Sequence, residues 1–509
     1  MRVVVIGYGP VGARFVDELL PAVRAGLVDL TVVGAEPVNP YNRVLVAEYA
    51  LGRLHWDDLE LHDAADARAA GARVLTGARV VAIDRPARTV RLYDGESLPY
   101  DRLVLATGAR SNVPTLDGVN RRDASRGAGL DHELPGGITV LRDRGDAELI
   151  AAAQPGCRVV VLGAGVLGLE FALLAAQDGM RVTVVHHGPV PMPRNLDRGA
   201  GTVLANALRA AGVEIIAHSR AEAVVFAHDA DGEPRFGALA TADGKTIPGD
   251  LLVLSCGVGA RTELAAECGL RTSAGVVVTP ELASCDDPVV FAIGDCAQVE
   301  DHAPSGLIGP GWRQADWLAA RFAADAGAGP HPGGPPLERA AVVMLKGGDI
   351  DVVAAGDVSA EPWDPAPTGT APPPAVAQWA DPQHGRYVKM VTRDGVLEAF
   401  ASVGMPRTGA ELTVLFERGG ELPSDRSLLL RFDGPDDEFG SSVDLFAPDS
   451  TVCLCNGVSV AQIETAVADG NDTVACVGKA TRAGTGCGGC RSRIAELIER
   501  SSPAAEPAI

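Results

Sequence analysis

The chain opens with RVVVIGYGPVGARFVDELL (2–20), a run of β-branched residues followed by three spaced glycines and a helical pattern. In this pattern Gly7 allows a tight turn, Gly9 lets the backbone approach a pyrophosphate, and Gly12 lets the helix pack closely on the strand. The N–H groups at the start of that helix then face the phosphates. A second strand, LTVVGAE, ends in Glu36, whose carboxylate can accept hydrogen bonds from a ribose diol. The opening therefore predicts a dinucleotide-binding α/β domain.

The same pattern recurs at CRVVVLGAGVLGLEFALLAAQDGMRVTVVHH (157–187), with three glycines at the same spacing. Two such units in one chain argue strongly against a chance match. Here the second strand ends in His186 and His187 in place of an acid. A histidine can accommodate a 2′-phosphate, which favours NADPH, or it can simply cap the loop. The preference between NADH and NADPH stays open.

Two further turns follow strands in the order that this architecture requires. YDRLVLATGAR (100–110) contains an Ala-Thr-Gly turn, and VVFAIGDCA (289–297) contains a Gly-Asp turn. With the two loops, they resemble the FAD-dependent pyridine-nucleotide oxidoreductases of the glutathione-reductase-like fold. NPYNRVLVAEY (39–49) is also similar to that family, in which a Pro-Tyr-x-Arg turn touches FAD. The resemblance implies an α/β fold with two dinucleotide-binding domains, one for FAD and one for NAD(P)H.

The resemblance also implies which residues contact each cofactor. For FAD they are Gly7, Gly9, Pro10, Gly12, Glu36, Arg43, Val80, Ala106, Thr107, Gly108 and Asp295, the last bonding the ribityl chain. For NAD(P)H they are Gly163, Gly165, Gly168, Glu170, His186 and Gly257. No acid–base residue is expected to be essential, because the flavin does the chemistry and the protein positions it. Disulphide reductases of this fold carry a CxxxxC pair after the Pro-Tyr-x-Arg turn, and residues 41–56 contain no cysteine, so we expect no dithiol chemistry.

Four cysteines stand close together near the end of the chain, in CLC (453–455) and TGCGGC (485–490). Ser459 and Gln462 form a capping-box pattern for one helix, and a second helix is expected to begin around the last cysteines. Two short helices would then gather the four cysteines at one end of a small domain, which often needs a metal for stability. Four thiolates can hold zinc or an iron–sulfur cluster, and spacing alone does not separate these.

This segment resembles the bacterioferritin-associated ferredoxin-like [2Fe-2S] domain in its CxC, Thr-x-Ala-Gly-x-x-Cys and CxxC elements. The resemblance favours a [2Fe-2S] cluster over zinc. It implies four ligands, Cys453, Cys455, Cys487 and Cys490. The chemical context agrees, because a flavin accepts a hydride and releases electrons singly to such a carrier, whereas zinc is redox-inactive. Cys476, in the same segment, is expected to lie in the core.

The motifs divide the chain into domains. We expect FAD-binding parts at 1–118 and 249–325, an NAD(P)-binding domain at 119–248, a small α+β interface-like domain at 335–445, a small helical [2Fe-2S] domain at 450–500 and a tail at 501–509. The second half of 306–323 reads as an amphipathic helix. In the interface-like domain we expect strands around a Gly-Gly turn at 342–357, a proline-rich exposed loop at 361–383, and a hairpin across Asp394-Gly395 at 386–404.

The composition of the chain limits the classes of partner that it is expected to bind. The chain has 509 residues, 44 Lys and Arg against 66 Asp and Glu, and a net charge of −22. Such an acidic surface repels phosphate backbones and anionic lipid, so we expect no nucleic-acid or membrane partner. No signal-peptide pattern is visible, and the other six cysteines are scattered singly, which is typical of a reducing cytoplasm. The longest apolar run, 159–176, contains Glu170 and the loop glycines, so it reads as a strand, turn and helix.

The whole arrangement is similar to the N-terminal half of the assimilatory NAD(P)H nitrite reductase large subunits and to the related nitrate reductase electron-transfer subunits. We therefore expect an NAD(P)H-dependent FAD and [2Fe-2S] electron-transfer oxidoreductase that serves a separate acceptor, suspected to be the catalytic subunit of nitrate or nitrite assimilation. No further cysteine group follows, so nitrite reduction is not expected on this polypeptide. Two alternatives stay open: a general ferredoxin-reductase-like or oxygenase-linked reductase, and a flavoprotein whose cluster is a regulatory redox sensor. The oligomeric state is not predicted.

Overall fold

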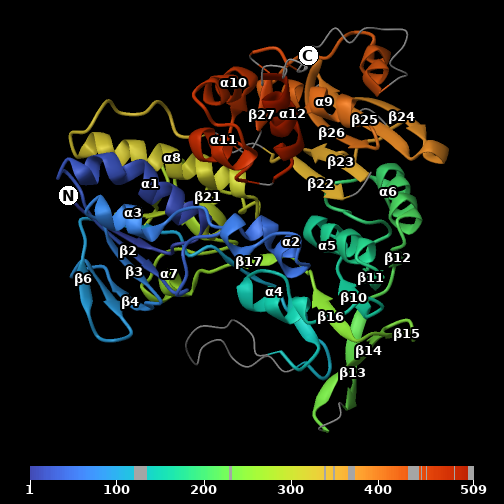
Figure 1. The fold of residues 1–509 in the computed structure, drawn as a ribbon, viewed down its shortest axis with the longest axis horizontal. Coiled ribbons are helices and arrows are strands. Elements are labelled where there is room, and N and C mark those ends of the chain that lie inside the picture. Colours follow the sequence, from blue (N-terminus) through green and yellow to red (C-terminus); the bar gives the residue numbers. More distant parts are fainter. Residues whose placement is uncertain are drawn as a thin grey trace, which may run out of the picture.

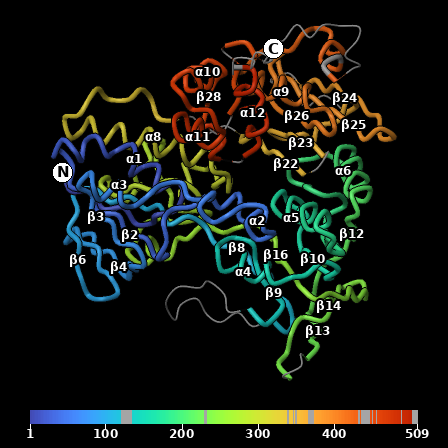
Figure 2. Tube along the Cα trace, viewed as in Figure 1, coloured from blue at the N-terminus to red at the C-terminus, as the bar shows by residue number. Residues whose placement is uncertain are grey.

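The computed structural model describes residues 1–119, 134–228, 232–336, 340–347, 350–364, 373–433, 446–448, 450–453, 456–486 and 488–501. Figure 1 shows four parts: a first domain in blue and yellow, a second in cyan and green, a third in orange, and a small C-terminal module in red. The trace in Figure 2 shows that yellow segments return to lie among the blue ones. The second domain is therefore inserted between two stretches of the first.

The first domain is built on an eight-stranded sheet in the order β21-β18-β19-β20-β7-β1-β2-β3. Its strands are β1 (Arg2–Ile6), β2 (Asp29–Gly34), β3 (Arg73–Thr76), β7 (Arg102–Leu105), β18 (Val276–Val278), β19 (Ala283–Ser284), β20 (Asp287–Ala292) and β21 (Ala297–Val299). The β-branched run of β1 is buried from Val3 to Ile6, as expected for a parallel strand covered on both faces. β20 pairs in parallel with β7, which joins the two stretches of this domain into one sheet.

Helices α1 (Pro10–Arg24) and α8 (Ile308–Asp325) pack side by side against this sheet. Phe15 meets Phe322 edge to face, with ring centroids 5.7 Å apart. The helix expected in the second half of 306–323 thus begins earlier than predicted. The remaining elements of the domain are α2 (Val46–Ala50), α3 (Ala64–Ala69), α7 (Glu263–Glu267), the 3-10 turn η1 (Arg43–Leu45), and an antiparallel sheet of β4 (Val80–Asp84), β5 (Thr89–Leu92) and β6 (Ser97–Pro99).

The second domain contains a five-stranded parallel sheet in the order β12-β11-β10-β16-β9. Its strands are β9 (Ile138–Val140), β10 (Arg158–Leu162), β11 (Arg181–Val185), β12 (Glu214–Ile216) and β16 (Leu251–Leu254), and its helices are α4 (Arg144–Ala151), α5 (Val166–Gln177) and α6 (Arg198–Ala210). β16 lies beyond residue 248, where we expected this domain to end. The boundary is corrected to beyond Leu254, because β16 pairs with both β10 and β9.

Short antiparallel strands complete the second domain and its connection to the first. β13 (Ala221–His228), β14 (Pro234–Thr241) and β15 (Thr246–Pro248) form a three-stranded sheet. β8 (Ala109–Ser111) pairs with β17 (Val258–Ala260), and these two strands lie on the outgoing and the returning chain. The two chain segments that connect the domains are therefore hydrogen-bonded to each other.

The third domain is an antiparallel sheet in the order β22-β23-β26-β25-β24, followed by a helix. Its elements are β22 (Val343–Gly347), β23 (Ile350–Ala355), β24 (Ala375–Asp381), β25 (Arg386–Arg393), β26 (Val396–Val403) and α9 (Pro406–Arg418). The hairpin is confirmed: Asp394 and Gly395 have φ angles of 50° and 83°, as a two-residue turn with left-handed positions requires. The loop expected over 361–383 is corrected at its end, because Ala375–Asp381 form β24, which pairs with β25 along its whole length. Residues 365–372 of that loop lie outside the described residues.

The C-terminal module contains one helix more than predicted. It has two short strands, β27 (Thr451–Cys453) and β28 (Val458–Ser459), and helices α10 (Val460–Ala468), α11 (Val474–Thr481) and α12 (Arg491–Ser501). The capping box of Ser459 and Gln462 is confirmed. The prediction that Cys476 is buried is wrong: it is exposed, in the first turn of α11, where Thr473 caps the helix by accepting from its backbone N–H.

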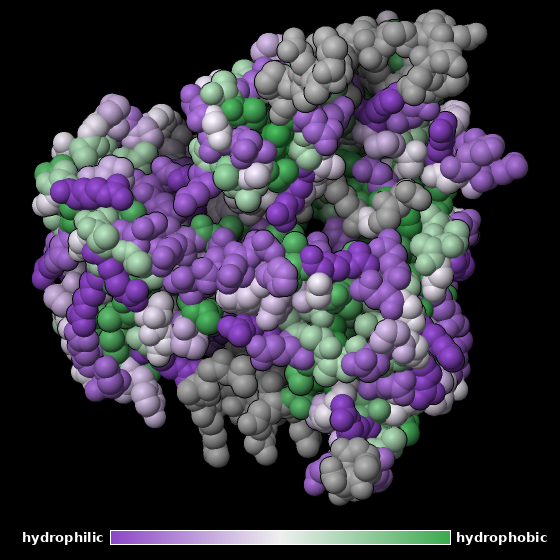
Figure 3. Space-filling view, in the orientation of Figure 1, coloured by the Kyte–Doolittle hydropathy of each residue, from purple (hydrophilic) through white to green (hydrophobic). Residues whose placement is uncertain are grey.

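The surface agrees with the acidic, polar composition. Figure 3 shows hydrophilic residues over most of the visible face, with hydrophobic ones scattered between them. In the part of the chain that the structure describes, no helix combines the length and the apolar character needed to cross a membrane.

Candidate redox site

The first glycine loop is shaped by the packing of the backbone and by an open space beside it. Gly7 has a φ angle of 112°, and a Cβ on it would lie 2.1 Å from the carbonyl oxygen of Ala106. A Cβ on Gly12 would lie 2.2 Å from the carbonyl oxygen of Gly7. For Gly9, by contrast, no described atom beyond its chain neighbours lies within 4 Å of that position. This pattern fits a loop in which the middle glycine leaves room for a phosphate.

The second loop repeats this geometry. Gly163 has a φ angle of 114°, and its Cβ would lie 2.1 Å from the carbonyl oxygen of Ser255. A Cβ on Gly168 would meet the Ser255 hydroxyl at 2.8 Å, whereas among described atoms nothing lies within 4 Å of that position on Gly165. Gly257 also has positive φ, 81°, in the turn directly after β16. The structure therefore contains two separate cradles with room for a dinucleotide phosphate.

Glu36 lies just beyond β2 and is the centre of a small polar group. The hydroxyl of Tyr41 donates to Glu36 at 2.8 Å, and the Arg43 guanidinium pairs with the other carboxylate oxygen. The guanidinium also stacks on the Tyr41 ring at 4.8 Å from the centroid. Burial raises the pKa of Tyr41, so its hydroxyl keeps its proton at neutral pH. The side chain of Glu36 stays 44% exposed, so it is still accessible to a ribose.

Asp295 is paired with a residue that the sequence did not single out. Arg142, in the turn between β9 and α4, donates through Nη2 to Asp295 at 3.0 Å. The Nε of Arg142 is buried and makes no hydrogen bond to any described residue. A buried donor without a partner beside a predicted cofactor ligand fits a site that takes an anionic group. No local motif marks Arg142; only the contact between the two domains brings it to Asp295.

The other residues predicted for FAD lie on the same domain. The Thr107 hydroxyl donates to the carbonyl of Arg261 at 2.9 Å, which fixes the Ala-Thr-Gly turn, and Gly108 there has a φ angle of 69°. Val80 begins β4 and is buried. Pro10 begins α1, and its carbonyl accepts from the Trp312 indole at 3.2 Å. Beside Asp295 lies a cavity of about 550 Å³, whose lining includes Gly294, His302, Gly311 and Gln314.

His186 directly follows β11, and its ring is buried. Neither ring nitrogen has a hydrogen-bond partner among the described residues. Burial lowers its pKa to about 4, so the ring is neutral at pH 7. A buried neutral ring favours the alternative in which His186 holds the loop after β11, while His187 next to it is exposed. Glu170 lies on α5, one turn from the loop glycines.

Two of the four predicted cluster ligands fall within the described residues. Cys453 and Cys490 are both buried, and the Cys490 side chain lies close enough to Cys453 to affect its pKa. This contact, with backbone N–H groups of Gly484 and Asn456, lowers the pKa of Cys453 to about 6, which favours the thiolate that a metal binds. Cys455 and Cys487 lie outside the described residues. The donor pair present therefore fits a metal–sulfur site.

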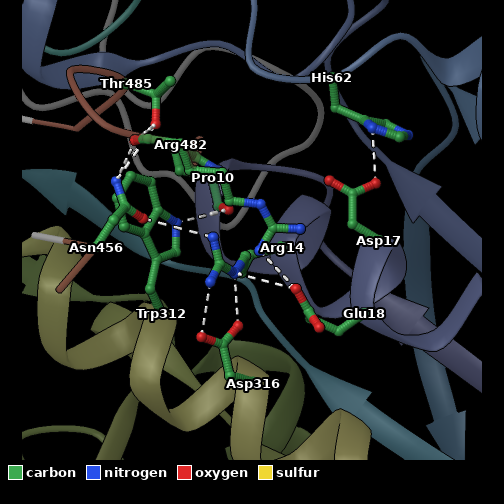
Figure 4. Close-up of polar contacts among 10 residues, drawn as sticks. All are labelled: Pro10, Arg14, Asp17, Glu18, His62, Trp312, Asp316, Asn456, Arg482 and Thr485. Atoms are coloured by element: carbon green, nitrogen blue, oxygen red, sulfur yellow. Dashed lines mark hydrogen bonds and ion pairs between the residues drawn. The ribbon is translucent and has the colours of Figure 1, made fainter. Parts of the chain in front are cut away.

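The cysteine module lies directly on the first domain. The amide of Asn42 donates to the carbonyls of Thr485 and Gly486, at 2.7 and 2.5 Å, directly before Cys487. Figure 4 shows a second contact, in which Arg14 of α1 is held by Asp316 of α8 and reaches Asn456 at 3.5 Å. In the same view Arg482 donates to Glu18 of α1 at 2.5 Å. The two candidate redox sites are therefore adjacent.

Comparison with known proteins agrees with this geometry. Residues 1–313 match the family described as pyridine nucleotide-disulphide oxidoreductase, and residues 451–500 match the BFD-like [2Fe-2S] binding domain. The chain is 28% identical over 504 residues to a nitrite reductase [NAD(P)H] of Bacillus subtilis, covering 98% of this chain and 58% of the relative. It is 28% identical over 520 residues to the assimilatory nitrate reductase electron transfer subunit of the same organism, covering 99% of this chain and 61% of the relative. The chain thus spans less than two thirds of the length of these relatives.

Solved structures show the same architecture. A ferredoxin reductase from Rhodopseudomonas palustris superposes with a TM-score of 0.64 at 26% identity, covering 79% of this chain and 91% of that one. A putidaredoxin reductase–putidaredoxin complex, at 24% identity, superposes with a TM-score of 0.68 and covers 84% of this chain and 95% of that one, which shows the shared fold.

The matches also settle the cofactors expected from the sequence. The first implies FAD and NAD(P)H, and the second implies a [2Fe-2S] cluster rather than zinc. The two glycine cradles and the buried cysteine pair are consistent with these groups. The chain belongs to the pyridine nucleotide-disulphide oxidoreductase family and carries a BFD-like [2Fe-2S] binding domain.

Proposed function

We propose that this protein transfers electrons from NAD(P)H, through FAD and the [2Fe-2S] cluster, to a separate catalytic protein of nitrate or nitrite assimilation. The observation that carries this proposal is the contact between Asn42, in the predicted FAD turn, and the loop that leads to Cys487. A module that lies against the flavin domain is well placed to take electrons from it. A cluster used only for sensing has no need of such a contact.

In this proposal each part of the chain has one task. Bound FAD supplies the conversion from a two-electron hydride to single electrons, and the cluster is a one-electron relay. The loop Gly163–Gly168 and Gly257 hold NAD(P)H, and Glu170 lies toward the nicotinamide end. The loop Gly7–Gly12, Glu36 and Arg43 hold the ADP half of FAD, and Asp295 with Arg142 holds its middle part. Cys453, Cys455, Cys487 and Cys490 hold the cluster.

The identity of the acceptor rests on relatives that match along nearly the whole chain. The nitrite reductase and nitrate reductase relatives each align with 97% of this chain or more, so the match extends into the cysteine module. This supports an acceptor of the nitrate or nitrite reductase type. A nitrate reductase and a nitrite reductase are therefore both candidate acceptors.

A second candidate acceptor is the small ferredoxin of an oxygenase system. Rhodocoxin reductase of Rhodococcus erythropolis is 34% identical to this chain, a higher identity than that of the nitrite reductases, but over only 314 residues. The ferredoxin–NAD(+) reductase component of a biphenyl dioxygenase system from Paraburkholderia xenovorans is also 32% identical over 297 residues, which supports a reductase of the oxygenase type. The similarity to rhodocoxin reductase extends over 60% of this chain, whereas the nitrite and nitrate reductase relatives align with 97% or more.

The internal pathway is tested by anaerobic titration of the purified protein with NADH and then NADPH, followed by absorbance and by electron paramagnetic resonance. We expect the flavin absorbance to bleach and a cluster signal to appear. Cys487→Ser should abolish the cluster signal and acceptor reduction while rapid flavin reduction continues. Cys476→Ser is the matched control, because Cys476 lies in the same module but is exposed. Loss of flavin reduction in Cys487→Ser would contradict separate stations.

The acceptor is tested by supplying the protein and NAD(P)H to purified nitrate reductase, nitrite reductase and oxygenase ferredoxin in parallel. We expect turnover with one of the first two and none when Cys487 is replaced by serine. Rapid reduction of the ferredoxin alone would establish the second candidate. Turnover that survives removal of residues 450–509 would show that the module has a regulatory task instead.

A further inference from the structure

The residue that joins the two redox sites most directly is Asn42. Its side chain is buried, with 1% of its surface exposed. Its Nδ2 donates to two carbonyls of the cysteine module, of Thr485 at 2.7 Å and of Gly486 at 2.5 Å. Close to it, a Cβ on Gly488 would lie 3.4 Å from the Leu45 side chain. Thr485, Gly486 and Gly488 therefore lie against the turn that begins with Tyr41.

Both polar atoms of the Asn42 amide form hydrogen bonds. While Nδ2 donates across the interface, Oδ1 accepts from the backbone N–H of Val44 at 3.0 Å and so caps the turn η1. This turn directs Tyr41 and Arg43 toward Glu36. One side chain thus fixes the conformation of the predicted FAD turn and holds the loop that leads to Cys487. Only an amide of this length provides both the acceptor and the N–H donors.

A second set of contacts reaches the other cysteine pair. Asn456 donates to the carbonyl of Arg482 at 2.7 Å and lies 3.8 Å from the sulfur of Cys453. Its Oδ1 faces Arg14, which is anchored on α8 by Asp316, as Figure 4 shows. Thr485 and Gly486 are thus bonded to Asn42 of the first domain, and Asn456 is bonded to Arg14. Each of these three residues of the module lies within three positions of a predicted cluster ligand along the chain. These contacts hold the described part of the module in a defined position on the first domain.

We propose that Asn42 is a positioning residue for electron transfer. By bonding Thr485 and Gly486, it holds the loop that leads to Cys487 and Cys490 on the turn that begins with Tyr41, so that electrons pass from the flavin to the cluster while the module is docked. This rests on the proposed transfer from flavin to cluster. The physical reason is that the rate of electron transfer falls steeply with separation, so a loop held by two hydrogen bonds keeps the distance short. Supporting residues that orient a metal site typically change its activity by about 10- to 100-fold when they are replaced.

The test compares Asn42→Asp with Asn471→Asp in the full chain loaded with FAD and cluster. Aspartate keeps the acceptor that caps η1 but removes both donors and places a negative charge against two carbonyl oxygens. Asn471 is the matched control, because its Nδ2 donates to the carbonyl of Ala466 at 2.8 Å within the module alone. Asn42→Ser is a second variant: it also keeps a capping hydroxyl but is neutral and too short to span the interface.

The readouts separate positioning from folding. After rapid mixing with NADH or NADPH we compare the rate of cluster reduction with the rate of flavin reduction in the same FAD-loaded sample. We expect this ratio to fall roughly 10- to 100-fold in both Asn42 variants and to stay at the wild-type value in Asn471→Asp. Hydrogen exchange of residues 483–491 should rise in the Asn42 variants and stay unchanged in Asn471→Asp, whether or not electrons flow. The cluster resonance spectrum should shift only in the Asn42 variants.

Two results would overturn the proposal. One is cluster reduction in both Asn42 variants as fast as in Asn471→Asp; the other is unchanged exchange of residues 483–491. If Asn42→Asp loses its cluster or fails to fold, Asn42→Ser decides alone by the same criteria. If the wild-type protein itself reduces no cluster with NAD(P)H, the proposed function fails first, and the exchange measurement still decides whether Asn42 holds the loop.

Discussion

Gly165 offers a sharp test of the second nucleotide cradle, because alanine fits the protein there but intrudes on the ligand space. Gly165 caps α5 with φ −83° and ψ 174°, an extended conformation that alanine adopts without strain. No described atom beyond the chain neighbours lies within 4 Å of an added Cβ. The loss of glycine at an N-cap is offset by lower entropy of the unfolded chain, so we expect Gly165→Ala to change stability by less than about 1 kcal/mol.

The effect on NAD(P)H binding should be much larger. The added methyl group occupies the space through which a pyrophosphate approaches the N–H groups at the start of α5. A hydrogen bond to a charged group contributes about 1.5–3 kcal/mol. Losing one such bond raises the dissociation constant roughly 10- to 150-fold, since about 1.4 kcal/mol corresponds to a factor of ten. The rate of flavin reduction at saturating NAD(P)H should change far less.

The assay is rapid-mixing flavin reduction over a range of NADH and NADPH concentrations, with FAD content and melting temperature measured on the same samples. Gly9→Ala is the matched variant in the first cradle and should lower FAD content instead. Gly163→Ala should lower the melting temperature, because its Cβ would lie 2.1 Å from the carbonyl oxygen of Ser255 at a φ of 114°. Wild-type affinity for both nucleotides in Gly165→Ala would refute the placement of the pyrophosphate at this loop.

Three further predictions concern single side chains. Lys389 is fully buried and donates to Asp197 at 3.1 Å and to Glu361 at 3.2 Å. Lys389→Met leaves these carboxylates without their cation and should lower the free energy of unfolding by about 3 kcal/mol. Adding Asp197→Asn should partly restore the melting temperature, and no restoration would contradict this prediction. Arg142→Met removes the partner of Asp295 and should raise the dissociation constant of FAD roughly 10- to 150-fold, measured by equilibrium dialysis, whereas Arg73→Met at the surface should not. His186, with a pKa lowered from 6.5 to about 4, stays neutral in the folded chain while the unfolded chain takes up a proton, so its contribution is present above pH 6.5 and lost as the pH falls toward 4. His186→Phe should flatten melting temperature against pH in that window; coinciding wild-type and variant curves would rule this out.

The sequence by itself determined the features that depend on neighbours along the chain. The glycine loops at Gly7 and Gly163 and the hairpin at Asp394-Gly395 all require backbone conformations that few residues adopt, and the structure has glycine or aspartate with positive φ at these positions. The capping box at Ser459 likewise joins residues within one turn of a helix. Such patterns are readable because both partners lie within a few residues of each other.

Only the tertiary structure decided the features whose partners lie far apart. Asn42 meets Gly486, and Arg142 meets Asp295, across 444 and 153 residues of chain. Nothing near either residue in sequence indicates the contact. The exposure of Cys476 was misjudged for the same reason, since burial depends on what packs against a side chain. β24 was missed because its strand conformation comes from pairing with β25 rather than from its own proline-flanked sequence. Local motifs thus carried the family resemblance that implies the cofactors, whereas long-range packing decided how their sites meet.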